Sequence, residues 1–257
     1  MALLALGCGA ARGAAEPPAR ALLARPDGPG AFYLVGGGED RQALFKKFLA
    51  LSGGPDAPLV VAPLAAGAPS GDRSRAALEG VGARHVTVLT GDPARLAAER
   101  EALKAAWGVW FTGGLPDKLL GAFAPYREAT DAAWRAGATI GGTSAGAMAW
   151  GGRLIMRGEG SEAPTLASGL GFLPGILIDP HFSARSRFPR LYSATGETGM
   201  LGLGVDEETA AIVTMDGQLE VYGAGAVTVI RPDGEAARVM LVRSRERLDL
   251  RAWGLVK

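Results

Sequence analysis

A candidate nucleophile lies in the segment Gly142-Thr143-Ser144-Ala145-Gly146, which fits the pattern G-x-S-x-G. In this pattern a serine occupies a sharp strand-to-helix turn, and the strained backbone of the turn requires small neighbours. The turn lifts the hydroxyl clear of the sheet and directs the first N–H groups of the helix at the place where negative charge develops. Because the chain contains 39 glycines, the pattern also fits a turn of small residues without catalytic function.

A nucleophilic serine needs a base, which is usually histidine, and the chain has two histidines, His85 and His181. His85 precedes the β-rich run 86–89 and is expected to cap a strand at the surface. His181 follows the apolar run 176–178 and is therefore predicted at the carboxyl end of a strand. Parallel α/β sheets hold their sites at this edge, so His181 is the preferred base.

A carboxylate that orients the histidine would complete the site. Asp206 and Glu207 follow the apolar run 203–205, again at a predicted strand end, although Glu207 also fits an exposed acid at a turn. The order Ser, His, acid differs from the order Ser, acid, His of α/β-hydrolases. The acids between Ser144 and His181 are weaker candidates, because two lie in a loop rich in Gly, Ser and Pro and the third is too close to His181 in sequence: Glu159, Glu162 and Asp179.

The elements that must position these residues alternate between strand and helix from residue 31 onward. Strands are predicted at 31–35, 59–62, 85–89, 108–111 and 139–141, and helices at 43–51, 70–81, 94–106 and 125–136. This alternation implies βαβ crossovers and a parallel sheet covered by helices on both faces. We therefore predict an α/β fold in which Ser144, His181 and one of the acids at 206–207 meet at the carboxyl edge of one sheet.

The C-terminal part of the chain changes in character. Apolar runs at 210–214 and 219–222 flank Asp216-Gly217, and runs at 226–230 and 237–242 flank Pro232-Asp233-Gly234. Asp-Gly between apolar runs is typical of a β-hairpin, so we expect antiparallel hairpins that extend the sheet. Residues 31–257 are predicted to form one catalytic domain.

Residues 1–30 differ from the rest of the chain and are predicted to be a disordered or signal-like segment. Leu4-Ala5-Leu6-Gly7-Cys8 resembles the end of a lipoprotein signal, but the segment lacks a basic start and its apolar run is short. Export and a cytoplasmic location therefore both remain open. Cys8 is the single cysteine, which excludes an internal disulfide and any cysteine-based metal cluster.

The bulk composition excludes several classes of function. The formal net charge of +1 gives no basic field for a nucleic acid. No apolar run reaches the roughly 18 residues that a membrane-spanning helix needs. Two histidines without HExxH-type spacing predict neither a metal site nor a cofactor, and the glycines at 36–38 do not complete the G-x-G-x-x-G pattern of a nucleotide site.

Five segments resemble, in the same order, the motifs of the cyanophycinase-type serine peptidases, peptidase family S51. They cover most of residues 31–215. They are Leu34-Val35-Gly36-Gly37-Gly38-Glu39-Asp40, Phe111-Thr112-Gly113-Gly114, the nucleophile segment Gly142–Ala147, the histidine segment from Asp179 to Leu191, and the acid segment Gly202–Ala210.

The resemblance implies a class I glutamine-amidotransferase-like fold, a three-layer sandwich with a mostly parallel sheet. It also implies a triad of Ser144, His181 and Glu207, an oxyanion hole from the N–H groups of Gly114 and Ala145, and no cofactor. Three arginines match family residues that meet substrate carboxylates, although internal ion pairs to Asp179 or Glu207 explain them equally well: Arg185, Arg187 and Arg190. A homodimer is a further implication.

The chain departs from the family pattern at Leu115, Pro116 and Pro180. The family carries Asp-Gln at the first two positions and Gln at the third, and those glutamines contact the β-linked aspartyl group. Proline has no side-chain donor or acceptor, so these contacts are absent here. We therefore expect a serine-type exopeptidase or isopeptidase that acts on a small aspartyl peptide or a cyanophycin-like polymer. The alternatives are an α/β-hydrolase esterase and a catalytically inactive binding protein on an amidotransferase-like scaffold.

Overall fold

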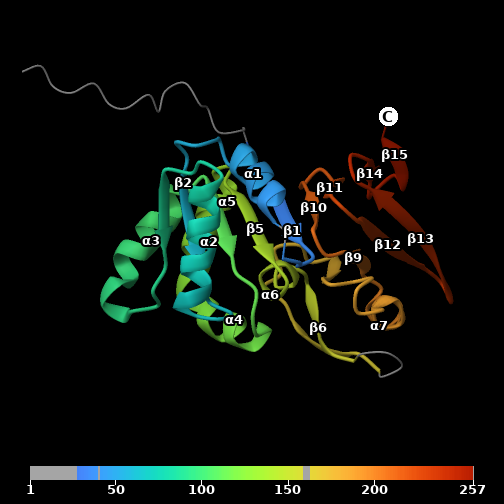
Figure 1. Ribbon diagram of the computed structural model, residues 1–257. Coiled ribbons are helices and arrows are strands. Elements are labelled where there is room, and N and C mark those ends of the chain that lie inside the picture. The colour runs from blue at the N-terminus through green and yellow to red at the C-terminus, as the bar shows by residue number, and fades with distance from the viewer. Residues whose placement is uncertain (1–27, 40, 159–162, 257) are drawn as a thin grey trace, which may run out of the picture.

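The computed structural model describes residues 28–39, 41–158 and 163–256 (Figure 1). Most of the predicted N-terminal segment, with Cys8, lies outside the described residues. The same holds for Asp40 of the first glycine segment and for the alternative acids Glu159 and Glu162.

The larger of two main sheets has nine strands and contains the predicted parallel strands. Five strands run parallel in the order β1 (Phe32–Val35), β5 (Thr139–Thr143), β4 (Gly108–Phe111), β2 (Pro58–Ala62) and β3 (His85–Val88). β1, β4 and β5 are buried along their whole length, as expected for strands covered on both faces. The predicted α/β class is confirmed.

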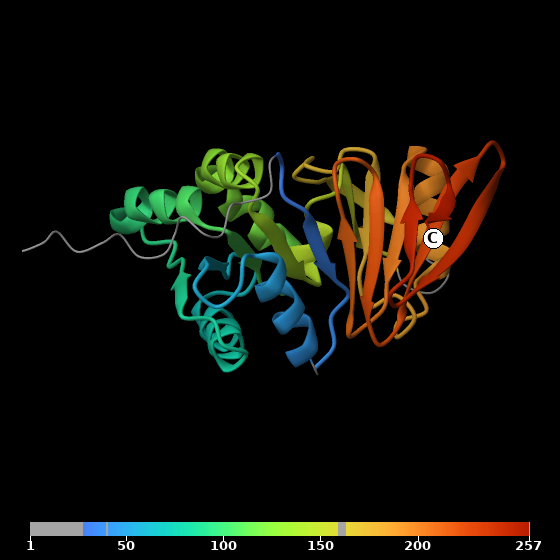
Figure 2. The same cartoon turned by 90° about the horizontal axis from the view of Figure 1, so that it is seen from above.

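Helices cover both faces of these parallel strands (Figure 2). On one face lie α1 (Gln42–Leu51) and α2 (Ala68–Gly80), whose apolar side chains pack around Trp110. On the other face lie α3 (Leu96–Ala105), α4 (Pro116–Phe123) and α5 (Arg127–Arg135), whose apolar side chains pack around Phe111 and Trp150. Short 3-10 turns precede two of them, at Pro93–Arg95 and Ala124–Tyr126.

The first predicted hairpin extends the large sheet. β10 (Thr209–Val213) pairs antiparallel with β1, and it is followed across the sheet by β11 (Gln218–Gly223), β14 (Arg247–Asp249) and β15 (Gly254–Val256). The turn at Asp216-Gly217 joins β10 to β11, as the Asp-Gly signal predicts.

The second predicted hairpin does not extend this sheet, which corrects the sequence-based expectation. β12 (Ala226–Asp233) and β13 (Ala236–Arg243) form a four-stranded sheet with β9 (Leu201–Val205) and β8 (Ile176–Asp179), in the order β13-β12-β9-β8. Strand β8 is joined to its parallel neighbour β9 through α7 (Phe188–Thr198). His181 and Glu207 therefore follow strands of this second sheet, whereas Ser144 follows a strand of the first.

Two helices and two strands around the nucleophile and the histidine were not predicted from the sequence. The helices α4 and α7 contain Pro or Gly, which have low helix propensity, and both begin next to a proline. β6 (Arg153–Arg157) and β7 (Thr165–Ser168) form a separate two-stranded hairpin after the short helix α6 (Ala145–Met148). α6 follows Ser144 directly, as the nucleophile pattern requires.

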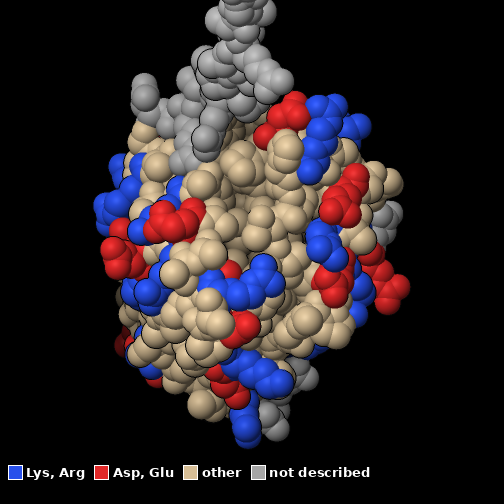
Figure 3. Space-filling view, turned by 90° about the vertical axis from the view of Figure 1, so that its left-hand side faces the viewer, with Lys and Arg blue, Asp and Glu red and all other residues tan. Residues whose placement is uncertain are grey.

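The described surface carries charges of both signs. On the face near α3, Lys and Arg are interspersed with Asp and Glu (Figure 3). None of the helices between residues 28 and 256 that the structure describes has the length and apolar character to cross a membrane.

Candidate active site

Ser144 lies in a sharp turn between the end of β5 and the start of α6. Its backbone has φ 53° and ψ −118°, a conformation that residues other than glycine rarely adopt. A Cβ atom at Gly142 would lie 2.2 Å from the carbonyl oxygen of Gly146, and one at Gly146 would lie 2.3 Å from that of Phe111. Both glycines of G-x-S-x-G are therefore required, because the backbone packs too closely for any side chain.

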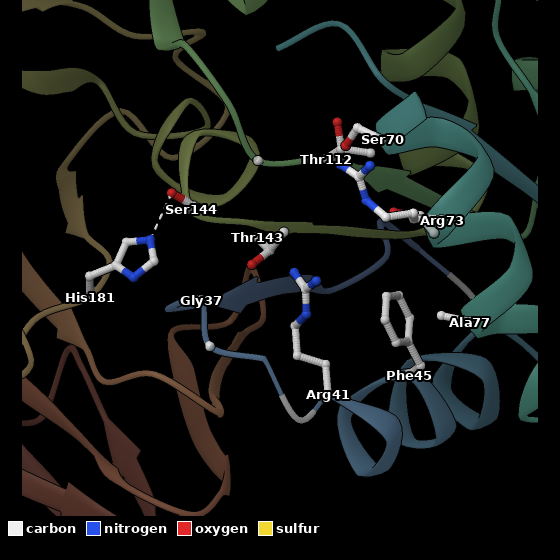
Figure 4. Close-up of a pocket in the computed structure, with 13 residues that line it drawn as sticks. Gly37, Arg41, Phe45, Ser70, Arg73, Ala77, Thr112, Thr143, Ser144 and His181 are labelled. Carbon is white, nitrogen blue, oxygen red and sulfur yellow. Dashed lines mark hydrogen bonds between the residues drawn. The ribbon is translucent and has the colours of Figure 1, made fainter. Parts of the chain in front are cut away.

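His181 lies two residues beyond the end of β8, with its imidazole facing Ser144. The distance from Nε2 of His181 to Oγ of Ser144 is 3.0 Å (Figure 4). The backbone N–H of His181 donates to the carbonyl of Gly36 at 2.7 Å. A Cβ atom at Gly37 would lie 2.2 Å from Cε1 of the imidazole, so the glycine loop after β1 lies directly against the ring.

Glu207, which follows β9, faces the other side of the imidazole. Its Oε1 lies 2.6 Å from Nδ1 of His181. The neighbouring Asp206 is held elsewhere, because its carboxylate accepts the backbone N–H groups of Ser183 and Ala226, each at 3.1 Å. Of the two acids at this strand end, only Glu207 is placed to orient the histidine. The other histidine, His85, was expected to cap a strand at the surface, and it lies exposed at the start of β3.

The surroundings of His181 favour the neutral imidazole. Burial lowers the pKa of His181 from its usual value, the hydrogen bond to Glu207 opposes this shift, and the charge of Arg185 adds to it. With Nδ1–H donated to the carboxylate, the lone pair of Nε2 points at the serine hydroxyl. This is the arrangement that a general base needs.

Two backbone N–H groups lie beside the serine. Gly114 and Ala145 line one cavity together with Ser144. Within the described parts of the chain, neither N–H donates a hydrogen bond to another residue. Gly114 has φ 147°, and a Cβ atom there would lie 2.4 Å from the carbonyl oxygen of Ala65, so this loop also needs glycine. The arrangement can supply two donors to an oxyanion.

Two of the three predicted substrate-binding arginines are held in buried ion pairs. Arg187 and Arg190 are 7% and 4% exposed, and both pair with Asp179, which is fully buried at the end of β8. Nε of Arg190 donates to Asp179 at 2.7 Å. The internal pairing that the sequence left open thus occurs in the structure. Arg185 is exposed and lines the same cavity as Gly114.

Two cavities meet at Ser144 and His181. The first, of about 510 Å³, is lined by the predicted arginines and is called the Arg185 cavity: Gly114, Pro116, Ala145, Met148, Ile155, Met156, Arg157, Gly158, Pro180, Arg185, Arg187 and Arg190. The second, of about 240 Å³, shares only Ser144 and His181 with the first and is called the Arg41 cavity: Gly37, Gly38, Arg41, Phe45, Ser70, Arg73, Ser74, Ala77, Thr112, Gly113 and Thr143 (Figure 4).

Two of the three residues that depart from the family pattern line the Arg185 cavity. Pro116 and Pro180 line this cavity, and the side chain of Leu115 is 55% exposed. The sequence analysis missed Arg41 and Arg73 of the other cavity, because neither belongs to a motif with a recognisable spacing. In the described segments, no three His, Cys, Asp or Glu side chains gather in a way that could hold a metal ion.

Comparisons with known proteins relate this chain to one peptidase family. The model of the family described as "Peptidase family S51" matches residues 32–221. A cyanophycinase from Trichormus variabilis is 34% identical over 79% of this chain and 74% of its own length. A cyanophycinase from Geminocystis herdmanii is 34% identical over 79% of this chain and 80% of its own. The crystal structure of a peptidase from an acI-B1 Actinobacterium shares the fold, with a TM-score of 0.67 and 20% identity over 88% of this chain and 98% of that one.

Proposed function

The chain belongs to peptidase family S51 and is a hydrolase, and from this premise we propose that Ser144, His181 and Glu207 form its catalytic triad. The observation that carries the proposal is a pair of short distances at the imidazole of His181. Its Nε2 lies 3.0 Å from the hydroxyl of Ser144, and its Nδ1 lies 2.6 Å from the carboxylate of Glu207. Ser144 occupies the strained turn that exposes nucleophiles in α/β folds.

The first half of the reaction forms an acyl-enzyme. Oγ of Ser144 attacks the carbonyl carbon of an amide or isopeptide bond, and Nε2 of His181 takes the hydroxyl proton. The N–H groups of Gly114 and Ala145 donate to the oxyanion, while Glu207 stabilises the imidazolium through Nδ1–H. When the tetrahedral intermediate collapses, the C–N bond breaks and His181 passes the proton to the leaving amine.

The second half of the reaction releases the acyl group. His181 takes a proton from a water molecule, which attacks the ester carbonyl. The ester bond breaks, the proton returns to Oγ of Ser144, and a carboxylic acid leaves. The protons and electrons balance without a cofactor.

The substrate class that we propose is an aspartyl peptide or isopeptide of the cyanophycin type. Two cyanophycinases with 34% identity over most of this chain support this class. Since Pro116 and Pro180 bring no side-chain donor or acceptor to the Arg185 cavity, recognition there must use other groups than glutamines. Of the three predicted arginines, Arg185 is the exposed one, whereas Arg187 and Arg190 are buried and pair with Asp179.

Covalent labelling of the serine tests the proposal. Wild-type protein should react with a fluorophosphonate probe and hydrolyse β-linked aspartyl peptides or cyanophycin, whereas Ser144→Ala should lose both activities. Ser193→Ala, at an exposed position of α7, is the matched control and should behave as wild type. Undiminished labelling of Ser144→Ala would exclude Ser144 as the nucleophile. A wild-type protein that is neither labelled nor active would favour the binding-protein alternative.

A further inference from the structure

The Arg41 cavity contains two positive side chains beside the serine. Arg41 precedes α1, and Arg73 lies on α2. Figure 4 shows their guanidinium groups pointing into the cavity, with Ser144 and His181 at its far end. One cavity therefore connects both guanidinium groups with Ser144, where the reacting carbonyl of a bound substrate would lie.

Neither guanidinium is neutralised by the described part of the protein. Among the residues that the structure describes, no carboxylate lies within ion-pairing distance of Arg41 or Arg73, and Asp72 pairs with Arg75 at 3.0 Å instead. Burial, and then the charge of Arg73, lowers the pKa of Arg41. Two like charges that share one cavity repel each other, and an anion between them would remove this repulsion.

The wall of the cavity also holds buried polar atoms without partners. Thr112 and Thr143 are 1% and 4% exposed, and neither hydroxyl has a hydrogen-bond partner among the described residues. The same is true of Nε of Arg41. Buried polar groups in native proteins are normally hydrogen-bonded, so the wall of this cavity is polar and is not fully hydrogen-bonded by the described residues.

We propose that the Arg41 cavity is a subsite for one free carboxylate of the substrate, bound by the guanidinium groups of Arg41 and Arg73 beside the reacting carbonyl. This inference rests on the proposed function, because Ser144 defines where that carbonyl lies. The guanidinium fork matches a carboxylate in shape and charge, and an aspartyl isopeptide carries a free carboxylate on each side of its scissile bond. The volume of about 240 Å³ suits one such group rather than a long polymer segment.

Binding without turnover tests this inference separately from catalysis. The protein is Ser144→Ala, and the probe is the dipeptide β-aspartyl-arginine, compared with two analogues in which one of its two carboxylates is an amide. Calorimetry gives Kd for each ligand, alone and after the further substitution Arg41→Gln or Arg73→Gln. Each arginine substitution is expected to weaken binding of the dipeptide by roughly 10- to 100-fold in Kd. For the amide analogue that lacks the carboxylate bound in this cavity, the same substitutions should change Kd by less than about threefold.

The matched control is Arg75→Gln, which removes an exposed arginine from the same helix and should leave every Kd unchanged. Thermal unfolding checks that the variants fold, and Arg73→Gln at the exposed mouth of the cavity keeps the test valid if Arg41→Gln is unstable. Equal losses for the dipeptide and both amides, no loss at all, or no binding of the dipeptide would each overturn the inference. Failure of wild-type protein to hydrolyse both the dipeptide and cyanophycin, with carboxylate-dependent binding intact, would overturn only the proposed function.

Discussion

At the scale of single residues, burial and hydrogen bonding act in opposite directions on His181. Burial lowers the pKa of the imidazole, and the hydrogen bond to Glu207 at 2.6 Å raises it. Burial is the larger effect, so the imidazole stays neutral, and able to accept a proton, at a lower pH than a free histidine. The half-exposed carboxylate of Glu207 thus orients His181 and leaves its imidazole neutral.

This balance predicts the pH dependence of the reaction. Activity requires the neutral imidazole, so kcat/KM should fall only as the pH decreases through the lowered pKa, which places the acid limb below about pH 6.5. In Glu207→Gln the imidazole loses its hydrogen bond to a charged carboxylate, which raises the pKa of His181 in wild type. The acid limb of the variant should therefore move to still lower pH. The plateau of kcat/KM should decrease by about 10²- to 10⁴-fold, because the imidazolium of the transition state loses its counter-charge.

The measurement is kcat/KM against pH for wild type, Glu207→Gln and the control Glu197→Gln, whose side chain is exposed on α7. An acid limb above pH 7 in wild type, or one that moves upward in Glu207→Gln, would contradict the assignment of Glu207.

At the scale of elements, the turn between β5 and α6 depends on how closely α6 approaches β4. The carbonyl group of Phe111 at the end of β4 occupies the space where a side chain of residue 146 would lie. A backbone atom cannot move away as the end of a flexible side chain can. The geometry of Ser144 is therefore set by the packing of a helix on a neighbouring strand.

Gly146→Ala tests this packing. The new methyl group would meet Phe111 at 2.3 Å, so α6 and β4 must separate and the serine must shift. We expect a loss of stability of about 1–3 kcal/mol and at least a tenfold slower fluorophosphonate labelling. Gly121→Ala is the control, because Gly121 lies in helix α4 with open space around its Cβ position, and it should be neutral or slightly stabilising. Normal labelling in Gly146→Ala would show that the turn tolerates a side chain.

At the scale of the whole molecule, one apolar cluster joins the two sheets. It contains Phe32 of the nine-stranded sheet, Leu203 of the four-stranded sheet and Trp150 between α6 and β6. The nucleophile and the histidine come from different sheets, so their distance of 3.0 Å depends on this shared core. The single catalytic domain expected for residues 31–257 and the homodimer both remain predictions.

Leu203→Ala tests the coupling between the sheets. Leu203 is fully buried, so truncation should reduce the free energy of unfolding by about 2–5 kcal/mol. The variant should therefore unfold at a lower temperature than wild type. Because the core is shared, the circular dichroism signal, the tryptophan fluorescence signal and the labelling of Ser144 should all change in one transition at that temperature. Val239→Ala, at an exposed position of β13, is the control and should change the midpoint little. Separate transitions for labelling and for circular dichroism would contradict a shared core.

Local patterns in the sequence were sufficient for the parallel strands of residues 31–143 and for their helices except α4, for the nucleophile turn and for the hairpin at Asp216-Gly217. These features depend on periodicity, glycine spacing and turn chemistry, which act over a few residues. Pro and Gly obscured α4 and α7, because packing against the sheets overrides their low helix propensity.

Only the tertiary structure decided which distant side chains meet. It separated Glu207 from Asp206, paired Arg187 and Arg190 with Asp179, and brought Arg41 and Arg73 to one cavity. It also placed β8 and β9 in a second sheet, although their apolar runs fit either sheet equally well. Such contacts depend on strand order and on helix packing between segments far apart in the chain, and no local spacing of residues specifies them.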